Sequence, residues 1–142
     1  MNRVFCLDTS VLVSYLVPDE REPQADTLVL EVVSGAARLV APAFAWAEIG
    51  SVLRKKIRMG LLTAEQAQGC YEDFCALPID YISEESVRMR AWELAVEYQL
   101  PTLYDTAFLA VAESESAQFW TIDQVLLNQL SPRPAYVHEL GE

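Results

Sequence analysis

The sequence has few of the residues on which several common chemistries depend. His138 is its only histidine, so catalysis by a pair of histidines is excluded, and its position in a predicted edge strand indicates a surface role. The cysteines Cys6, Cys70 and Cys75 form no CxxC pair, so we expect neither a disulfide framework nor a zinc site, but buried and reduced thiols. No Walker-type or GxGxxG loop is present, which excludes the usual nucleotide-binding motifs.

Long apolar runs are also absent. None reaches the roughly 20 residues needed to cross a bilayer, and the first residues lack the apolar region and cleavage site of a secretory signal. We therefore expect a cytoplasmic protein that does not enter a membrane.

Basic residues are scarce, because 10 Lys and Arg stand against 21 Asp and Glu, for a net charge of -11. This balance argues against nonspecific coating of nucleic acid, which requires many cations to neutralise phosphates. It does not exclude an enzyme that meets a phosphate through bound metal, since metal ions reverse the local field.

Apolar residues make up 52% of the 142 residues, which suits one domain, 1–142, with a single core. Short apolar segments alternate with helical patterns. Strands are predicted at 3–7, 38–41, 78–82, 118–121 and 135–138, and helices at 11–17, 23–34, 42–60, 63–77, 84–98, 102–114 and 123–130. This alternation predicts an α/β fold, a three-layer α/β/α sandwich with a central mostly parallel sheet.

Several helix ends are marked by the sequence. Thr9 and Ser10 are good N-cap residues for the first helix, and Pro42 can open the third. Thr63, followed by Gln66, predicts a capping box for the fourth helix. Ser83 is the predicted cap of the fifth.

Two acidic residues follow predicted strands directly. Asp8 comes after the first strand, and Asp123 after the strand that ends at Thr121. In open α/β sheets, ligands bind beyond the carboxyl ends of the strands. Both residues are therefore candidates for a site, and N-capping of the following helix is the alternative for each.

Two further carboxylates lie on apolar helices. Glu48 stands among Ala45, Ile49 and Val52, and Asp105 precedes a nearly all-apolar helix. A carboxylate held partly out of water must find a hydrogen-bond donor, a cation or a proton. The alternative for each is a rim position whose oxygens reach solvent.

The four carboxylates together indicate a metal site. Two carboxylates about 4 Å apart repel by roughly 4 kcal/mol at an effective dielectric near 20, so four that converge need a compensating cation. Mg²⁺ and Mn²⁺ prefer such oxygen ligands. Periodicity alone does not establish that the four converge.

A basic cluster, Arg54, Lys55, Lys56 and Arg58, follows Glu48 on the same predicted helix. These residues are candidates for contacts to the phosphates of a nucleic acid. The alternative is a solvated helix end whose cations complement the helix dipole. The tryptophans Trp46, Trp92 and Trp120 are expected in the core or on a dimer surface.

The ordered set of acidic motifs resembles the PIN domain, and the whole chain resembles the VapC-type toxins of toxin–antitoxin pairs. The motifs that carry the resemblance are Leu7-Asp8-Thr9-Ser10, Ala47-Glu48-Ile49, Tyr104-Asp105 and Thr121-Ile122-Asp123. Each motif is weak alone, whereas the four in this order and spacing are specific.

The resemblance implies a PIN-like fold whose acidic pocket binds Mg²⁺ or Mn²⁺ and cuts single-stranded regions of RNA. It also implies a homodimer and a cognate antitoxin whose tail lies in the acidic groove. The family's acidic positions match Asp8, Glu48, Asp105 and Asp123, and its supporting hydroxyl positions match Ser10 and Thr121. The chain departs from the family at Thr106, where Ala is common.

For the mechanism, we expect Asp8 and Asp105 to be the main direct metal ligands. Glu48 and Asp123 would bind a second ion or hold metal-bound waters, and one can serve as a general base. Two other functions remain open, a catalytically idle PIN-like scaffold that binds RNA or protein and a metal-dependent phosphatase. Phosphatases with an aspartyl nucleophile require a second acidic residue two positions after the first, where this chain has Ser10.

Overall fold

The computed structural model describes residues 3–142. Within this range the chain forms a five-stranded sheet with the strand order β3-β2-β1-β4-β5. Every neighbouring pair of strands is parallel, so the predicted α/β class is confirmed and the sheet is wholly rather than mostly parallel.

The strands are β1 (Arg3–Leu7), β2 (Ala37–Pro42), β3 (Ile79–Ile82), β4 (Gln118–Thr121) and β5 (Val137–Glu139). The α-helices are α1 (Thr9–Leu16), α2 (Pro23–Val33), α3 (Ala45–Arg58), α4 (Ala64–Cys75), α5 (Glu85–Glu97), α6 (Tyr104–Ser114) and α7 (Gln124–Gln129), and a short 3-10 helix, η1, spans Pro18–Glu20.

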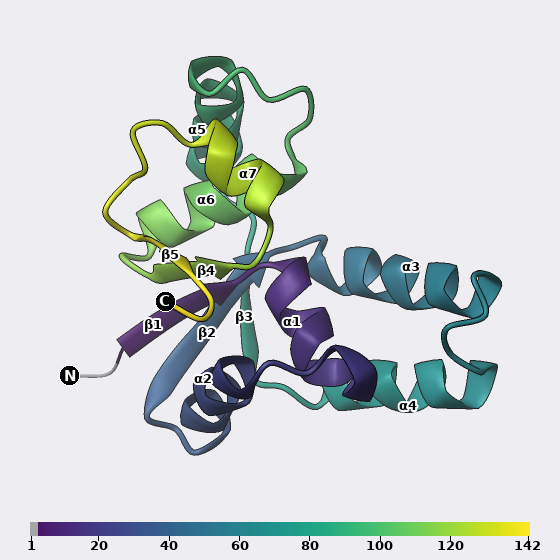
Figure 1. Ribbon diagram of the computed structural model, residues 1–142. Coiled ribbons are helices and arrows are strands. Elements are labelled where there is room, and N and C mark those ends of the chain that lie inside the picture. The colour runs from purple at the N-terminus through teal and green to yellow at the C-terminus, as the bar shows by residue number, and fades with distance from the viewer. Residues whose placement is uncertain (1–2) are drawn as a thin grey trace.

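The two faces of the sheet are covered by different helices (Figure 1). Strand β1 shows how: Phe5 and Leu7 are buried against α1 and α2 on one face, and Cys6 is buried on the other, against α6. Successive side chains of a strand point to opposite faces. A strand buried on both sides therefore reads as a continuous apolar run, as residues 4–7 do.

Helices α3 and α4 form a hairpin arm that extends beyond the sheet (Figure 1). The turn between them contains Gly60, whose positive φ of 74° suits glycine. The capping box predicted at Thr63 and Gln66 is confirmed. An ion pair of 2.6 Å between Lys56 and Glu20 joins the arm to η1.

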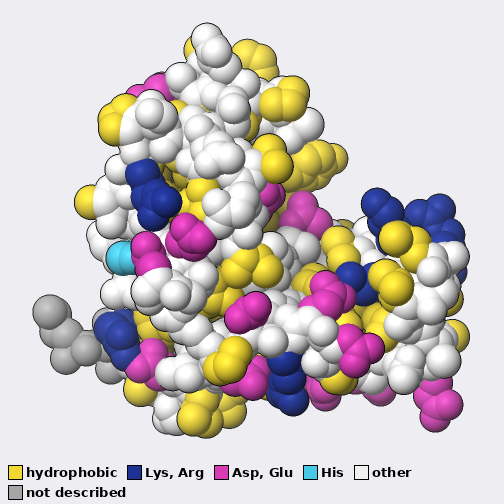
Figure 2. Space-filling view, viewed as in Figure 1, with side chains coloured by type: hydrophobic (Ala, Val, Ile, Leu, Met, Phe, Trp, Pro, Cys, Tyr) yellow, Lys and Arg dark blue, Asp and Glu magenta, His cyan; other side chains and the backbone are white. Residues whose placement is uncertain are grey.

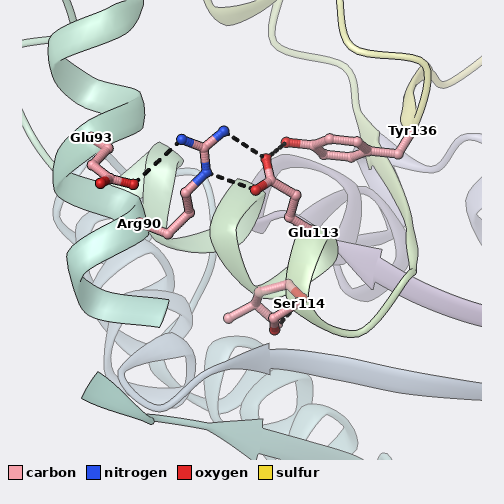
Figure 3. A network of polar contacts seen from close by, with 6 residues as sticks. Arg90, Glu93, Glu113, Ser114 and Tyr136 are labelled. Atoms are coloured by element: carbon pink, nitrogen blue, oxygen red, sulfur yellow. Dashed lines mark hydrogen bonds and ion pairs between the residues drawn. The ribbon is translucent and has the colours of Figure 1, made fainter. Parts of the chain in front are cut away.

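A polar network fixes α5 and α6 to the segment before β5 (Figure 3). The Arg90 Nε donates to Glu113 Oε1 at 2.7 Å, and the Tyr136 hydroxyl donates to Glu113 Oε2 at 3.1 Å. The hydrogen bond to Glu113 raises the pKa of Arg90. Desolvation first, and then the charge of Glu113, raise the pKa of Tyr136.

Three predicted helix starts are wrong. The first helix is capped by Asp8, whose side chain accepts from the Val11 amide, and not by Thr9 or Ser10. Strand β2 runs through Pro42, which pairs in register with Ile82, so α3 begins at Ala45 instead. The N-cap of α5 is Glu84 rather than Ser83, and it makes no side-chain cap hydrogen bond.

The predicted state of the cysteines is confirmed in part. All three are free, and Cys6 and Cys70 are buried, but Cys75 is exposed. Cys75 is the last residue of α4, and its neighbour Phe74 is the residue buried in the core there. In residues 3–142 no helix has the length and apolarity to span a bilayer.

Candidate acidic site

Asp8 is the most buried of the candidate carboxylates. It follows β1, caps α1, and is 5% exposed. Its Oδ1 accepts hydrogen bonds from the Val11 amide at 3.1 Å and from the Ser10 hydroxyl at 2.5 Å. Both candidate roles of Asp8 are therefore compatible, because one oxygen of a carboxylate can cap a helix while the other stays available.

Burial raises the pKa of the Asp8 carboxyl from 3.8 to about 6. Hydrogen bonds from Ser10, Thr121 and the Val11 amide oppose this rise, since they stabilise the charged form. The negative charge of Asp105 adds to it.

The hydroxyls of Ser10 and Thr121 link Asp8 to the end of β4. They lie 3.5 Å apart, and Thr121 is fully buried. Ser10 Oγ accepts from the Ile122 amide at 3.2 Å, and Thr121 Oγ1 accepts from the Asp123 amide at 3.0 Å. Ser10 therefore connects the Asp8 carboxylate to the backbone of Ile122, and Thr121 contacts the backbone of Asp123.

Glu48 lies in the first turn of α3, and the Thr9 hydroxyl donates a hydrogen bond to its Oε1. The sequence indicated only a capping role for Thr9 and gave no indication of this contact. The signal available was a hydroxyl directly after the first acid. Its partner could not be inferred, because the contact depends on how α3 packs against α1.

Asp105 lies in the first turn of α6, and its carboxylate is partly buried. Burial raises the pKa of Asp105, and the charges of Asp123 and Glu48 raise it further. The next residue, Thr106, is fully buried and donates to the Leu103 carbonyl at 3.4 Å. The departure at Thr106 thus adds a local hydrogen bond.

Asp123 caps α7, and its Oδ1 accepts from the amides of Val125 and Leu126 at 3.0 and 3.2 Å. The capping role that the sequence left open for Asp123 is therefore present. Because Asp123 follows β4, which pairs with β1, it lies at the same edge of the sheet as Asp8.

The fold brings the four candidate carboxylates to one edge of the sheet. Asp105 acts electrostatically on Asp8, and both Asp123 and Glu48 act on Asp105. Among residues 3–142, however, no three Asp, Glu, His or Cys side chains are arranged to hold a metal ion. The donor set consists of hard carboxylate oxygens whose mutual repulsion a divalent cation would relieve. Mg²⁺ fits such a set because it keeps several of its waters and needs few protein ligands.

The basic cluster lies at the outer end of the arm, where Figure 2 shows Lys and Arg side chains gathered. Arg54, Lys55 and Arg58 are exposed. Lys56 is largely covered, and it pairs with Glu20. The cluster therefore lies along α3 from Glu48 but does not contact it.

The remaining candidate side chains are placed as follows. His138 lies in the edge strand β5, as predicted, and its ring stacks on that of Trp120 at 4.8 Å between centroids. Trp120 packs partly buried against the core. Trp46 and Trp92 are 53% and 59% exposed, so a core position is wrong for both.

Comparison with known proteins identifies the class to which this fold and acidic edge belong. The sequence model of the PIN domain matches residues 5–128, and the chain belongs to the PIN domain family. The resemblance seen in the acidic motifs is confirmed.

Particular relatives lie close in sequence or structure. The chain is 32% identical over 124 residues to Ribonuclease VapC3 of Pyrobaculum aerophilum, a match that covers 84% of this chain and 89% of the relative. The crystal structure of PAE2754 from Pyrobaculum aerophilum has a TM-score of 0.69 at 20% identity and covers 98% of this chain and 90% of that one. A toxin–antitoxin complex from Klebsiella pneumoniae has a TM-score of 0.64 at 19% identity and covers 96% of each chain. The two structures establish the fold.

Proposed function

We propose that this chain, acting as one domain over 1–142, is a metal-dependent endoribonuclease and the toxin of a toxin–antitoxin pair. The observation that carries the proposal is the arrival of Asp8, Glu48, Asp105 and Asp123 at one edge from four separate segments, with the pKa values of Asp8 and Asp105 raised. The similarity to Ribonuclease VapC3 and to a toxin–antitoxin complex supports it.

In this proposal the four acidic residues have different roles in metal binding. Asp8 and Asp105 ligate Mg²⁺ or Mn²⁺ directly, and Glu48 and Asp123 bind a second ion or hold its waters. Ser10 and Thr121 keep Asp8 and Asp123 in position through their hydrogen bonds. Bound divalent cations lower the pKa of a coordinated water and steady the charge on the leaving oxygen of a phosphodiester.

The arm supplies contacts to RNA phosphates. Lys55 lies two turns after Glu48 on the same side of α3, and its side chain is exposed. Arg54 and Arg58 flank it and are also exposed. Lys56 contributes less, because Glu20 already pairs with it. A chain of net charge -11 needs such a local positive strip to approach RNA.

The antitoxin partner would bind this chain in the cytoplasm. It would cover the acidic edge and the arm. A groove of about 520 Å³ runs between α3 and α4, and Trp46, Gly50 and Tyr71 line it. An apolar segment of an antitoxin fits this groove, and its tail would then reach the carboxylates.

A homodimer would use the outer side of α5. Met89, Trp92 and Val96 are 57%, 59% and 65% exposed there, and they lie at helical spacing on one side. Exposed apolar patches of this kind mark contact surfaces. Sedimentation of the Trp92→Glu variant tests the dimer, because a charge at the centre of such a surface would give monomers.

RNA cleavage with matched aspartate variants tests the proposed activity. A structured RNA with single-stranded loops is incubated with the wild type in Mn²⁺, in Mg²⁺ and in EDTA. We expect cleavage only with metal, and a loss of at least about 100-fold in Asp8→Asn and Asp105→Asn. Asp73→Asn, at an exposed position on α4, is the control and should cut like the wild type.

The outcomes separate the alternatives. Cleavage that persists in Asp8→Asn and Asp105→Asn would refute the site. Metal-dependent RNA binding without cleavage would favour an idle scaffold. Phosphate release from monoesters without RNA cleavage would favour a phosphatase.

A further inference from the structure

An apolar cavity lies beside the acidic edge and has no part in the function proposed so far. Its volume is about 530 Å³, within the range of roughly 300–1,000 Å³ typical of small-ligand sites. Its lining includes Pro42 and Ile82, which end β2 and β3, and Val87 and Ala91 of α5. The cavity therefore opens at the carboxyl ends of the strands, where ligands of open α/β sheets bind.

Two aromatic residues lie between the cavity and the Glu48 carboxylate. Phe44 and Tyr104 line it, and the same two residues line a neighbouring hollow that also contains Glu48. Their rings meet edge to face, with centroids 5.6 Å apart. Tyr104 is 61% exposed and directly precedes Asp105. A ligand that lies on Tyr104 is thus next to the proposed metal ligands.

The cavity also carries a cation in an apolar setting. Arg88 contributes to its lining and is exposed. Most arginines of the chain pair with carboxylates, but Arg88 has no ion-pair partner within residues 3–142. An exposed aromatic ring and a free guanidinium on apolar walls suit a planar ligand with hydrogen-bond acceptors on its edge.

We propose that the cavity is a nucleobase subsite for the RNA nucleotide that flanks the cleaved phosphodiester. The base stacks on Tyr104, and Arg88 donates hydrogen bonds to its acceptor atoms. This inference rests on the proposed ribonuclease function and adds a positioning site to it. A second copy of the chain is the weaker occupant, because the exposed apolar side chains of α5, Met89, Trp92 and Val96, do not line the cavity.

Abasic RNA tests the subsite. In the RNA cut in the assay above, nucleotides flanking the cleaved bond are replaced one at a time by abasic residues, and single-turnover cleavage is measured in Mn²⁺. We expect one abasic position to slow the wild type by about 10-fold or more, the size of one base–aromatic stack. Tyr104→Ala should slow cleavage of intact RNA by a similar factor and lose almost nothing further on the abasic RNA, because both changes remove the same contact.

Variants distinguish the parts of the subsite. Tyr104→Phe keeps the stacking ring and should retain the discrimination between intact and abasic RNA, whereas Arg88→Met should weaken it. Tyr81→Ala, at an exposed tyrosine of β3 outside the cavity, is the control. Equal cleavage of intact and abasic RNA, or additive losses with Tyr104→Ala, would overturn the proposal.

A binding measurement separates this inference from the ribonuclease proposal. Fluorescence anisotropy compares the intact and abasic RNAs on the wild type in EDTA and on Asp8→Asn in Mn²⁺. If the chain binds the intact RNA about 10-fold more tightly than the abasic RNA but does not cut it, the subsite proposal stands and the ribonuclease proposal is refuted. Equal binding of both RNAs overturns the subsite whatever the activity. A change in the sedimentation of free Tyr104→Ala would assign the cavity to an interface between copies and also overturn it.

Discussion

The Thr9 hydroxyl donates a hydrogen bond to the Glu48 carboxylate, and this contact joins the first turn of α1 to the first turn of α3. Thr9 directly follows Asp8, so the same helix start holds one candidate acid and orients another. Second-layer hydrogen bonds of this kind fix the direction of a metal-binding carboxylate.

Replacing Thr9 by Val tests this relationship, since Val keeps the shape and removes the hydroxyl. We expect RNA cleavage to fall by about 10-fold or more and the Mn²⁺ concentration for half-maximal activity to rise. Thr9→Ser restores the donor and should recover most of the activity. Unchanged metal dependence in Thr9→Val would show that the contact does not position Glu48.

Replacing Asp8 by Asn should stabilise the metal-free protein at neutral pH. The folded-state pKa of about 6 lies above the ordinary value of 3.8, so the folded state holds this proton more tightly than the unfolded chain. The stability from this proton is therefore complete below pH 3.8 and lost as the pH rises through 6. Above that pH the charged carboxylate costs about 3 kcal/mol, and Asn avoids this cost while still capping α1.

The measurement is urea unfolding of both proteins in EDTA at two pH values. The advantage of Asp8→Asn should be largest at pH 7.5 and fall to about half at pH 5, where part of the wild type is protonated. An advantage that is the same at both pH values would contradict a raised pKa at Asp8.

The capping box of α4 should contribute to stability. The Thr63 hydroxyl accepts from the Gln66 amide at 3.1 Å, and the Gln66 side chain accepts from the Thr63 amide at 2.9 Å. Thr63→Ala should therefore lower the free energy of unfolding by about 1 kcal/mol in urea titration. Ser83→Ala is the matched control, because Ser83 does not cap α5, and it should be close to neutral. Equal losses in the two variants would contradict the assigned caps.

The three thiols should differ in reactivity. Cys75 is exposed and should react with a thiol reagent in the folded protein. Cys6 donates to the Phe108 carbonyl at 3.4 Å, and burial, with the charge of Asp8, raises its pKa well above 9.0. Burial also raises the pKa of Cys70. Native Cys75→Ser should not react, whereas the same variant unfolded in urea should expose two thiols.

The layers of this fold were predictable because their signals are local. The run from Val4 to Leu7 is apolar at every position, which marks a strand buried on both sides. Thr63 and Gln66 mark a helix start by their spacing alone. The prediction that Pro42 opens a helix was wrong, because a proline can open a helix or end a strand. Only the pairing of Pro42 with Ile82 decides between the two.

The candidate site was predictable in its residues but not in its contacts. Asp8 and Asp123 follow strands, and topology alone sends the ends of parallel strands to one edge. Three features could not be predicted from a single sequence: the partner of the Thr9 hydroxyl, the exposure of Cys75 and the cavity beside Tyr104. All three depend on how distant helices pack.

Each candidate carboxylate lies at the beginning of a helix, Asp8 and Asp123 as caps of α1 and α7, Glu48 and Asp105 in the first turns of α3 and α6. A helix N-terminus carries roughly half a positive charge. Four such ends therefore soften the repulsion among the acids before any ion arrives. Under the proposed function, folding of the chain would therefore not require bound metal.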